Sequence, residues 1–288
     1  MSTDKEDITV VIATLGGDSL AATIQSLNSG ILVPAEILVC VPAENASKVA
    51  HLQGGTTSIV KTDFRGQVAQ RCAGFRRASS ALVMQLDDDL LLDKFCLERL
   101  AATLQAFGPK VAVAPALIDQ KTSNSVYKKP LKSGLLSLIY YWMMNGSDGY
   151  VPGRIDKSGS SVGVDPSTSE GTLYDVEWLA GGCVLHYKEN LVLENFWPLV
   201  GKAYYEDVVH SCILNSEGIR LVVDARARCS LEIFNQSSFK PKEFVNNLYR
   251  DYLGRRYFMR RFSRQSPRIY LFYVTRILSY LRTRFKAR

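Results

Sequence analysis

Three consecutive carboxylates, Asp87, Asp88 and Asp89, directly follow the apolar run ALVMQL. Like charges held this close repel one another, so each side chain needs solvent or a cation. Mg²⁺ is commonly held by one or two carboxylates together with substrate phosphates. In an extended segment Asp87 and Asp89 point to one side and Asp88 to the other. We therefore predict a Mn²⁺ or Mg²⁺ site with Asp89 as main ligand and Asp87 nearer the metal or a ribose. The alternative is an acidic turn that caps the following helix.

A second acidic pair, Glu206 and Asp207, opens a helical pattern within residues 202–217. A carboxylate within hydrogen-bond reach of a reacting hydroxyl can act as a general base. We expect Asp207 to be that base, with Glu206 as the next candidate. The structural alternative is a helix N-terminus, whose dipole favours acidic residues without any catalytic role.

The elements that must position these residues alternate along the chain. Apolar runs predict strands at residues 8–13, 36–41, 57–60, 81–86, 111–117, 178–187 and 219–224, with helices at 20–27, 66–79, 92–107 and from 206 onward. Strands that alternate with helices indicate an α/β fold with a mostly parallel, doubly wound sheet. Ligands bind beyond the carboxyl ends of such strands, so the loops after residues 13 and 86 should share one edge. Residues 145–173 predict a long loop or lid.

Three motifs in this order resemble family-2 glycosyltransferases, which have the GT-A fold, a Rossmann-like sheet. The segments ITVVIATLGGDSLAATIQSL, EILVC and FRGQVAQRCAGFRRASSALVMQLDDDLLL resemble the nucleotide-binding half of that family. The segment WLAGGCVLHYKE is similar to its acceptor-side Gly-Gly segment. The segment KAYYEDVVHS is similar to its Glu-Asp motif, whose aspartate is the general base. The resemblance covers roughly residues 8–225.

The resemblance implies an inverting transfer from a nucleotide-diphosphate sugar, with a UDP-sugar expected first, to a hydroxyl of a glycan or lipid-linked acceptor. It implies Mn²⁺ or Mg²⁺ as cofactor. Gly181 and Gly182 would let backbone approach the sugar closely, although a tight turn or bulge would explain them equally. On the acceptor side we also expect Trp178 in the site. On the donor side we expect Ala13, Thr14, Glu44, Arg65, Arg71, Asp87 and Asp88.

Three of the donor-side assignments carry alternatives. Many family members have an acidic residue just after the second strand, where this chain has the segment VPAE. Glu44 is the candidate substitute for that residue. Arg65 and Arg71 are candidates for the diphosphate or the base, and a solvated helix face would account for either arginine equally well.

Charge is divided unevenly along the chain. Residues 240–288 hold 14 Lys and Arg against 2 Asp and Glu, a net charge of +12, so residues 1–239 carry −5 of the total of +7. We expect residues 1–239 to form the catalytic domain, with 1–120 binding the nucleotide sugar and 121–239 the acceptor. Residues 240–288 predict a basic, amphipathic helical tail without a bilayer-spanning run.

From this basic tail we predict that the enzyme is cytoplasmic and binds peripherally to the anionic surface of the cytoplasmic face of a membrane. The alternative is that its helices pack on the catalytic domain with arginines directed outward. Residues 135–144, LLSLIYYWMM, add an apolar patch, for which buried core is the preferred interpretation over lipid contact or an acceptor site.

Composition excludes some function classes and leaves two rivals. Hydrophobic residues make up 47% and charged residues 22%, which is typical of a globular protein. Six widely spaced cysteines and a polar N-terminus without a signal peptide predict free thiols in a reducing compartment. A sugar-phosphate nucleotidyltransferase would need a basic phosphate loop, and TLGGDS has no Lys or Arg. A basic-tailed nucleic-acid binder would leave the three aspartates without a use, so no nucleic acid is expected.

Overall fold

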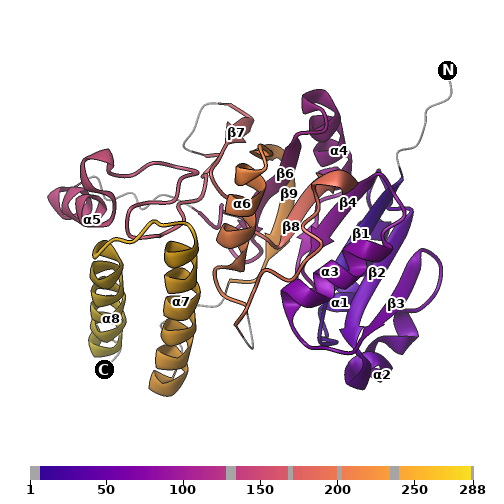
Figure 1. Cartoon of the computed structure of the whole chain (residues 1–288), viewed down its shortest axis with the longest axis horizontal. Coiled ribbons are helices and arrows are strands. Elements are labelled where there is room, and N and C mark those ends of the chain that lie inside the picture. Colours follow the sequence, from indigo (N-terminus) through magenta and orange to yellow (C-terminus); the bar gives the residue numbers. More distant parts are fainter. Residues whose placement is uncertain (1–6, 128–133, 168–170, 200–202, 234–239, 287–288) are drawn as a thin grey trace.

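The computed structural model describes residues 7–127, 134–167, 171–199, 203–233 and 240–286 (Figure 1). Strands occupy β1 (Ile8–Ala13), β2 (Glu36–Pro42), β3 (Thr57–Thr62), β4 (Leu82–Leu86), β5 (Leu91–Leu92), β6 (Val111–Asp119), β7 (Leu173–Asp175), β8 (Cys183–Tyr187) and β9 (Arg220–Leu231). The α-helices are α1 (Leu20–Asn28), α2 (Ala46–Val49), α3 (Gln67–Arg77), α4 (Cys96–Phe107), α5 (Leu135–Asn145), α6 (Glu206–Ser216), α7 (Pro241–Arg261) and α8 (Arg268–Lys286). Short 3₁₀ turns lie at Ala43–Asn45, Ala50–Leu52, Gly146–Asp148 and Lys188–Asn190.

One sheet runs through the described part of the chain in the order β3-β2-β1-β4-β8-β6-β9-β5, and β7 pairs with β9. Strands β3, β2, β1 and β4 are parallel, as are β6 and β9, whereas β8 is antiparallel to both β4 and β6. Strands β1, β2 and β4 are buried on both faces, which is why the sequence shows continuous apolar runs there. The predicted mostly parallel α/β sheet is confirmed.

Helices cover both faces of this sheet, as a doubly wound fold requires. Alternate residues of β1 divide between two cores: Ile8, Val10 and Ile12 pack with α1 and α4, and Val11 packs with α3. Helix α6 joins the second face through Leu214, which packs with residues of β6 and β8. The period of two along the strand therefore sets which helix lies on which side.

Three element boundaries differ from the sequence prediction by more than two residues. The strand expected over residues 178–187 begins only at Cys183. The helix expected over residues 92–107 begins only at Cys96, because Leu91 and Leu92 form β5 and pair antiparallel with β9. Strand β9 continues to Leu231, well beyond residue 224, and a register shift after Pro115 keeps it paired with β6. The pairing of β5 with β9 joins segments more than a hundred residues apart, so the local sequence carries no signal for it. Helix propensity alone therefore placed the start of the predicted helix too early.

The interpretation of residues 135–144 as buried core is wrong. They form α5, and most of its apolar side chains are exposed, with Leu136 at 83%. The helix lies away from the sheet and beside α8 (Figure 1). Arg268 of α8 donates to the carbonyl oxygens of Trp142 and Met143, both at 2.7 Å, and so closes the end of α5. Because α5 lies outside the sheet layers, the described part of the chain offers no hydrophobic core there to bury its apolar side chains.

The C-terminal helices α7 and α8 pack on the rest of the chain through one face of α7. Phe258 is fully buried, and a side chain at Gly254 would meet the carbonyl oxygen of Tyr204 at 2.2 Å. Helix α8 packs on α7 through Ile269 and Tyr273. The alternative in which the C-terminal helices pack on the rest of the chain therefore holds for the inner face of α7. Much of α8 remains exposed. None of the described helices is long and apolar enough to cross a bilayer.

Between the 3₁₀ turn Gly146–Asp148 and β7, the described residues of the predicted loop 145–173 form no helix or strand, and they are held from both sides. The Asp156 carboxylate accepts hydrogen bonds from the backbone N–H groups of Ser158 and Ser160 at 2.9 Å. The backbone at Gly159 has a φ of +80° and approaches the Arg255 side chain of α7, where a Cβ would lie 3.2 Å away. This loop is therefore packed between the sheet and the C-terminal helices.

Candidate functional site

The ends of β1 and β4 lie side by side and bring two polar loops together, as the sequence predicted. The backbone N–H of Thr14 donates to the Cys40 carbonyl oxygen at 3.0 Å, and the Thr14 hydroxyl donates to the Asp88 carboxylate. Ala13 is buried at the last position of β1. Asp88 thus contacts the β1 loop, whereas Asp87 contacts Arg71 and Gln67, and Asp88 and Asp89 lie in a turn rather than in an extended segment.

A buried arginine joins the two acidic motifs. Arg71, on α3, donates from Nη2 to Asp87 Oδ1 at 2.5 Å and from Nη1 to Glu206 Oε1 at 2.8 Å. Its side chain is only 5% exposed, so the interpretation of a solvated helix face is wrong for this residue. Burial alone would lower the pKa of Arg71, but the two carboxylates raise it above its usual value. The guanidinium is therefore a permanent cation between β4 and α6.

The paired glycines lie against the same acidic residues. A side chain on Gly181 would stand 3.1 Å from Asp207 Cβ, and one on Gly182 would stand 3.1 Å from Asp87 Oδ2. The Gly182 carbonyl oxygen accepts a hydrogen bond from the Asp87 backbone N–H at 2.7 Å. A Cβ at either position would be in tight contact with these acidic residues, so glycine suits both positions. The three motifs that the sequence connected only by resemblance therefore meet in one cluster.

The two acids at the start of α6 have perturbed protonation. Burial, and then the adjacent Glu206 carboxylate, raise the pKa of Asp207 to about 7. Burial also raises the pKa of Glu206, against the opposing effect of Arg71. The Asp207 Oδ1 atom accepts a hydrogen bond from the Val208 backbone N–H at 2.8 Å, so it also contributes to the helix start. A carboxyl group with a pKa near 7 can exchange a proton at neutral pH.

The turn before α6 is strained and is held by α7, which the sequence analysis did not anticipate. Tyr205 has a φ of +75°, a left-handed conformation that is costly for a residue with a side chain. Its ring packs edge-on against Phe258 at 5.3 Å and under the Arg255 guanidinium at 4.7 Å. Strain of this kind persists only where surrounding contacts enforce it, and here α7 supplies them.

Four further residues of the site were missed from the sequence. The Gln67 amide donates to Asp87 Oδ1 at 2.9 Å, and the Gln85 amide donates to the Gly181 carbonyl oxygen at 2.7 Å. The buried Gln70 amide donates to the carbonyl oxygens of Thr14 and Cys40. Tyr127 is half-buried, and its pKa is raised by desolvation and by the Asp207 charge. A polar Gln85 inside an otherwise apolar strand was the one signal that could have found part of this network.

Two expected donor residues lie outside the cluster. Glu44 is exposed in the 3₁₀ turn that follows β2, and Arg65 is exposed just before α3. Both positions follow the carboxyl ends of parallel strands, β2 and β3, so they share the edge with Asp87 to Asp89. Asp89 is exposed and Asp88 is half-buried at that edge.

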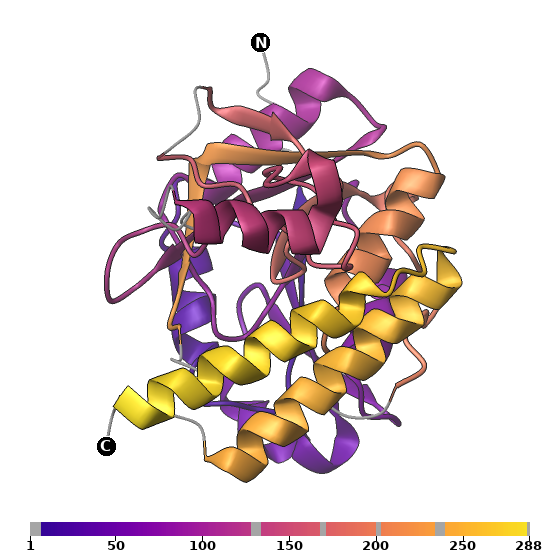
Figure 2. The same cartoon turned by 90° about the vertical axis from the view of Figure 1, so that its left-hand side faces the viewer.

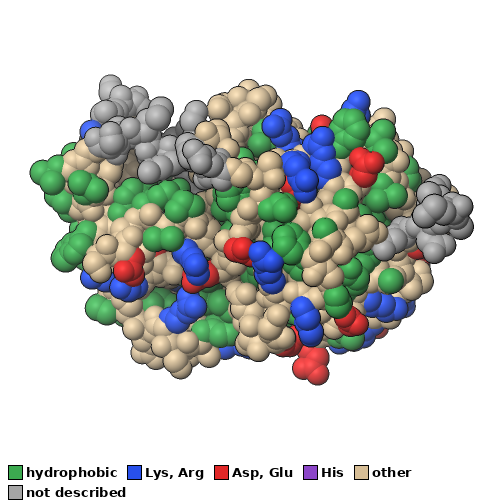
Figure 3. Space-filling view, turned by 90° about the horizontal axis from the view of Figure 1, so that it is seen from above, with side chains coloured by type: hydrophobic (Ala, Val, Ile, Leu, Met, Phe, Trp, Pro, Cys, Tyr) green, Lys and Arg blue, Asp and Glu red, His purple; other side chains and the backbone are tan. Residues whose placement is uncertain are grey.

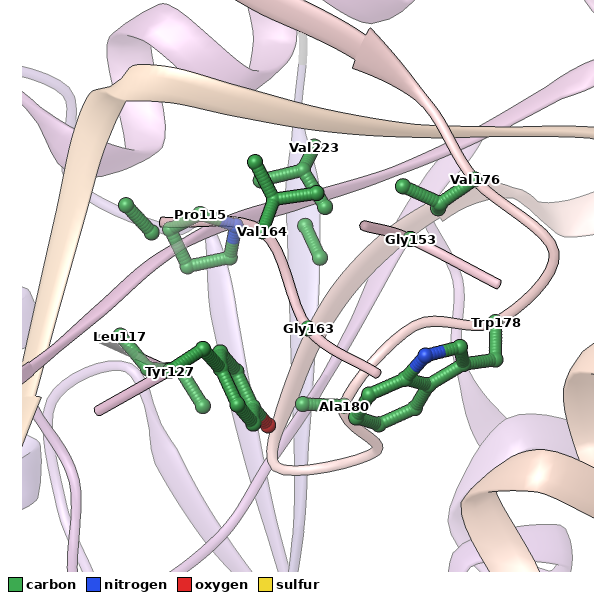
Figure 4. Close-up of a pocket in the computed structure, with 12 residues that line it drawn as sticks. Pro115, Leu117, Tyr127, Gly153, Gly163, Val164, Val176, Trp178, Ala180 and Val223 are labelled. Atoms are coloured by element: carbon green, nitrogen blue, oxygen red, sulfur yellow. The ribbon is translucent and has the colours of Figure 1, made fainter. Parts of the chain in front are cut away.

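Trp178 lines a small apolar pocket together with Tyr127 and Ala180 (Figure 4). Its indole N–H donates to the Val162 carbonyl oxygen at 2.9 Å, and its ring meets Tyr127 edge-on with centroids 5.6 Å apart. The residue is 6% exposed, so its side chain lies inside the protein. The loop residue Gly163 passes close over Tyr127, where a Cβ would overlap the ring.

The residues at the acidic edge fit a hard divalent cation whose shell the substrate completes. Within the described ranges, no group of three or more His, Cys, Asp or Glu residues could hold a metal ion by itself. Asp87 and Asp89 offer oxygen ligands, and one Asp87 oxygen already accepts from Arg71 and Gln67. Mg²⁺ and similar ions are commonly bound by one or two carboxylates plus phosphate oxygens. All six cysteines are buried and free.

The sheet order and its acidic edge define the GT-A fold of the glycosyltransferases. Among solved structures, the chain is similar to GalNAc-T7 with UDP, GalNAc and Mn²⁺, at 17% identity and a TM-score of 0.56, over 84% of this chain and 47% of that one. It is also similar to the mannosyltransferase PcManGT from Pyrobaculum calidifontis in complex with GDP-Man and Mn²⁺, at 15% identity and a TM-score of 0.54, over 90% and 64% of the respective chains.

These likenesses establish the fold. The chain spans about half the length of the first of these proteins and just under two thirds of the second. No protein-family profile matches the chain. No curated protein matches it in sequence either.

Proposed function

We propose that this chain is an inverting glycosyltransferase that moves a sugar from a nucleotide-diphosphate donor, a UDP-sugar being the first candidate, to an acceptor hydroxyl. The observation that carries the proposal is the cluster of Asp87, Arg71, Gly181, Gly182 and Asp207 at the ligand-binding edge of a GT-A fold. The fold neighbours crystallised with nucleotides or nucleotide sugars and Mn²⁺ support the choice of donor and metal.

Asp207 is the proposed general base. Its pKa of about 7 lets it take the proton of an acceptor hydroxyl at neutral pH and release it to solvent afterwards. Glu206 is the next candidate, but its Oε1 atom already accepts from Arg71 at 2.8 Å. Through that ion pair Glu206 instead fixes the start of α6, and with it the position of Asp207.

On the donor side, Thr14 and Asp88 hold the β1 and β4 loops together, and Ala13, Glu44 and Arg65 line the same edge. We assign these residues to the nucleotide, and Asp87 and Asp89 to the cation. Bound Mn²⁺ or Mg²⁺ would stabilise the charge that develops on the leaving diphosphate. Arg71 orients Asp87 by a charge-assisted hydrogen bond.

The acceptor enters, in this proposal, from the side of Gly181 and Gly182, whose backbone leaves room beside Asp207. We place Trp178, in the same segment of the chain, on this acceptor side as well. We take the acceptor to be a glycan or a lipid-linked molecule, and the enzyme to be peripheral on the cytoplasmic face of a membrane. The basic helices α7 and α8 support the membrane location.

The test is a thermal-shift panel of nucleotide sugars with and without Mn²⁺, since a ligand that binds only the folded state raises the melting temperature. We expect at least one UDP- or GDP-sugar to stabilise the protein only when Mn²⁺ is present. Asp89→Ala should remove the Mn²⁺-dependent part of that shift and leave the melting temperature of the unliganded protein unchanged, because Asp89 is exposed.

Glu217→Ala is the matched control, because Glu217 is an exposed carboxylate at the far end of α6. It should retain the full shift. An Asp89→Ala protein that still shows the Mn²⁺-dependent shift would remove Asp89 from the metal site. A panel in which no nucleotide sugar binds would argue against the transferase itself.

A further inference from the structure

Helix α5 exposes a continuous apolar stripe that nothing else in the described chain covers. Leu135 and Leu136 are 73% and 83% exposed, and Leu138, Ile139 and Trp142 are exposed as well. Their spacing places them along one side of the helix. Figure 3 shows hydrophobic side chains gathered at the left-hand end of the molecule, where α5 lies. A soluble surface rarely leaves large apolar side chains contiguous in this way without a partner.

Helix α8 adds a second apolar stripe beside the first. Its exposed side chains include Tyr270, Val274, Ile277, Leu278 and Leu281, again at helical spacing. Figure 2 shows α5, α7 and α8 together on the end of the molecule that faces the viewer. We refer to the exposed side chains of α5 and α8 together as the α5–α8 face.

The two helices are fixed to one another, so the face is a single preformed surface. Arg268 donates to two carbonyl oxygens at the end of α5, and its guanidinium lies 5.4 Å from the Trp142 ring centroid. On the other side, Tyr273 donates to Asp251 of α7, and Arg255 donates to the Tyr273 hydroxyl at 3.2 Å. Both stripes are therefore anchored to α7, which is itself packed on the catalytic part.

The two helices that form this face carry charges of one sign. Neither α5 nor α8 contains an Asp or Glu, whereas α8 carries Arg268, Arg276, Arg282 and Arg284. The acid nearest in sequence to α5, Asp148, is paired with Lys157 at 2.9 Å. An apolar face accompanied by arginines and free of acids is complementary to the anionic headgroups and acyl boundary of a bilayer.

The same charges disfavour a second copy of the chain as occupant. A twofold dimer through this face would place each patch against an identical patch. The arginines of one copy would then lie near those of the other without acids to pair with them, which is unfavourable at an interface. A bilayer offers the opposite charge and accepts the apolar side chains at the same time.

We propose that the α5–α8 face is a membrane-docking surface that binds the plane of an anionic bilayer. The proposal goes beyond the transfer reaction, and its central experiment requires no sugar donor. It also assigns the contact to α5 together with the outer face of α8, rather than to the basic tail as a whole.

The experiment is co-sedimentation of the full chain with vesicles of phosphatidylcholine alone and of phosphatidylcholine mixed with phosphatidylglycerol. We expect binding to the mixed vesicles, weakened as salt is raised. Leu136→Glu on α5 and Leu278→Glu on α8 should each lower the partition coefficient by about tenfold or more, since each removes a buried leucine from the bound state and adds a charge. The pair Arg282→Gln and Arg284→Gln should lower binding to anionic vesicles only.

The matched control is Ile31→Glu, because Ile31 is an equally exposed apolar residue, at 60%, between α1 and β2. It should bind vesicles as the unaltered chain does. Melting temperatures and the nucleotide-sugar shift should be unchanged in all these variants, which separates failed docking from failed donor binding.

Three outcomes would overturn the docking proposal. If the unaltered chain stays in the supernatant with anionic vesicles, the bilayer is not the partner. If Leu136→Glu and Leu278→Glu bind vesicles as well as Ile31→Glu does, the contact lies elsewhere on the protein. If light scattering shows a dimer that Leu136→Glu dissociates, and no vesicle binds, the face serves self-association.

Discussion

At the residue scale, the site is organised around the buried guanidinium of Arg71. It holds Asp87 of the acidic edge and Glu206 of α6 at hydrogen-bond distance, although these residues are far apart in sequence. Glu206 Oε2 and Arg71 Nε are buried and lack hydrogen-bond partners among the described residues. The arrangement therefore depends on the two ion pairs, since a buried charge without its partner is strongly unfavourable.

Replacement of Arg71 by Met should destabilise the protein by about 3–5 kcal/mol, because it leaves two partly or fully buried carboxylates without their cation. Urea denaturation of the purified variant measures this change. The double variant Arg71→Met with Glu206→Gln should recover part of the loss, as it removes one of the uncompensated charges. Equal stability of the single and double variants would show that Glu206 does not depend on this ion pair.

The raised pKa of the Asp207 carboxyl group predicts how the transfer rate depends on pH. With a pKa of about 7, it loses its proton as pH rises through neutrality, so the transfer rate should rise to a plateau above about pH 7. Asp207→Asn should lower the rate by about 10²- to 10⁴-fold while the donor-dependent thermal shift persists. A variant that keeps both its rate and the pH profile would exclude Asp207 as base.

The same shift predicts a pH dependence of stability with a definite sign. The folded state holds the Asp207 proton more tightly than the unfolded state, so the stabilisation is fully present below the unfolded pKa of about 4. It is lost as pH rises to about 7. The free energy of unfolding should therefore fall over this window less in Asp207→Asn than in the unaltered protein. Urea midpoints across the window measure the difference, and parallel curves would contradict it.

At the element scale, α7 acts as the support of the turn that leads into α6. Gly254 permits the approach, since its backbone lies against the Tyr204 carbonyl oxygen and the Trp197 ring. Arg255, one residue further, lies over the Tyr205 ring. The left-handed Tyr205 and the acids that follow it are therefore positioned by a helix that belongs to the basic C-terminal segment.

Gly254→Ala should destabilise the protein by about 1–3 kcal/mol through overpacking against the Tyr204 carbonyl oxygen. The result would be the reverse of helix propensity, which favours alanine by about 1 kcal/mol. Asn246→Ala is the control, because Asn246 is exposed on the same helix and should be neutral or slightly stabilising. Thermal unfolding measures both variants. A more stable Gly254→Ala protein would show that the turn before α6 can move to accommodate the added methyl group.

At the scale of the whole molecule, the loop over residues 145–173, helices α3 and α6 and the C-terminal helix pair share one apolar cluster. Trp178, Trp197, Val208, Phe258 and Tyr273 are buried in that cluster, although they come from five separate segments of the chain. Helix α8, which carries part of the α5–α8 face, is thus continuous in packing with the helix that carries Asp207.

A chain that ends at residue 239 should therefore fail to fold stably. It would lose Phe258 and Met259 from the core and expose Trp197, Val208 and the ring of Tyr205 to water. Insolubility, or a melting temperature far below that of the full chain, is the expected outcome of expression and thermal unfolding. A soluble, equally stable truncated protein would show that the C-terminal helices are dispensable for the fold.

The sequence alone determined the sheet and the acidic edge. Continuous apolar runs predict β1, β2 and β4 without reference to the rest of the chain, and the structure buries these strands on both faces. The aspartates follow β4 directly. Placement of both loops on one edge then follows from parallel pairing. These features depend on local pattern and on connection rules, both of which can be read residue by residue.

Only the tertiary structure decided what Arg71, α5 and α7 do. Arg71 meets its carboxylates across 16 and 135 residues of sequence, and no periodicity specifies such a contact. Helix α5 is apolar like a core segment, and its exposure depends on lying outside the sheet beside α8. Helix α7 carries the basic composition of a solvated tail while one face packs against the turn before Asp207. Burial is a property of neighbours in space, so composition and spacing could not assign it.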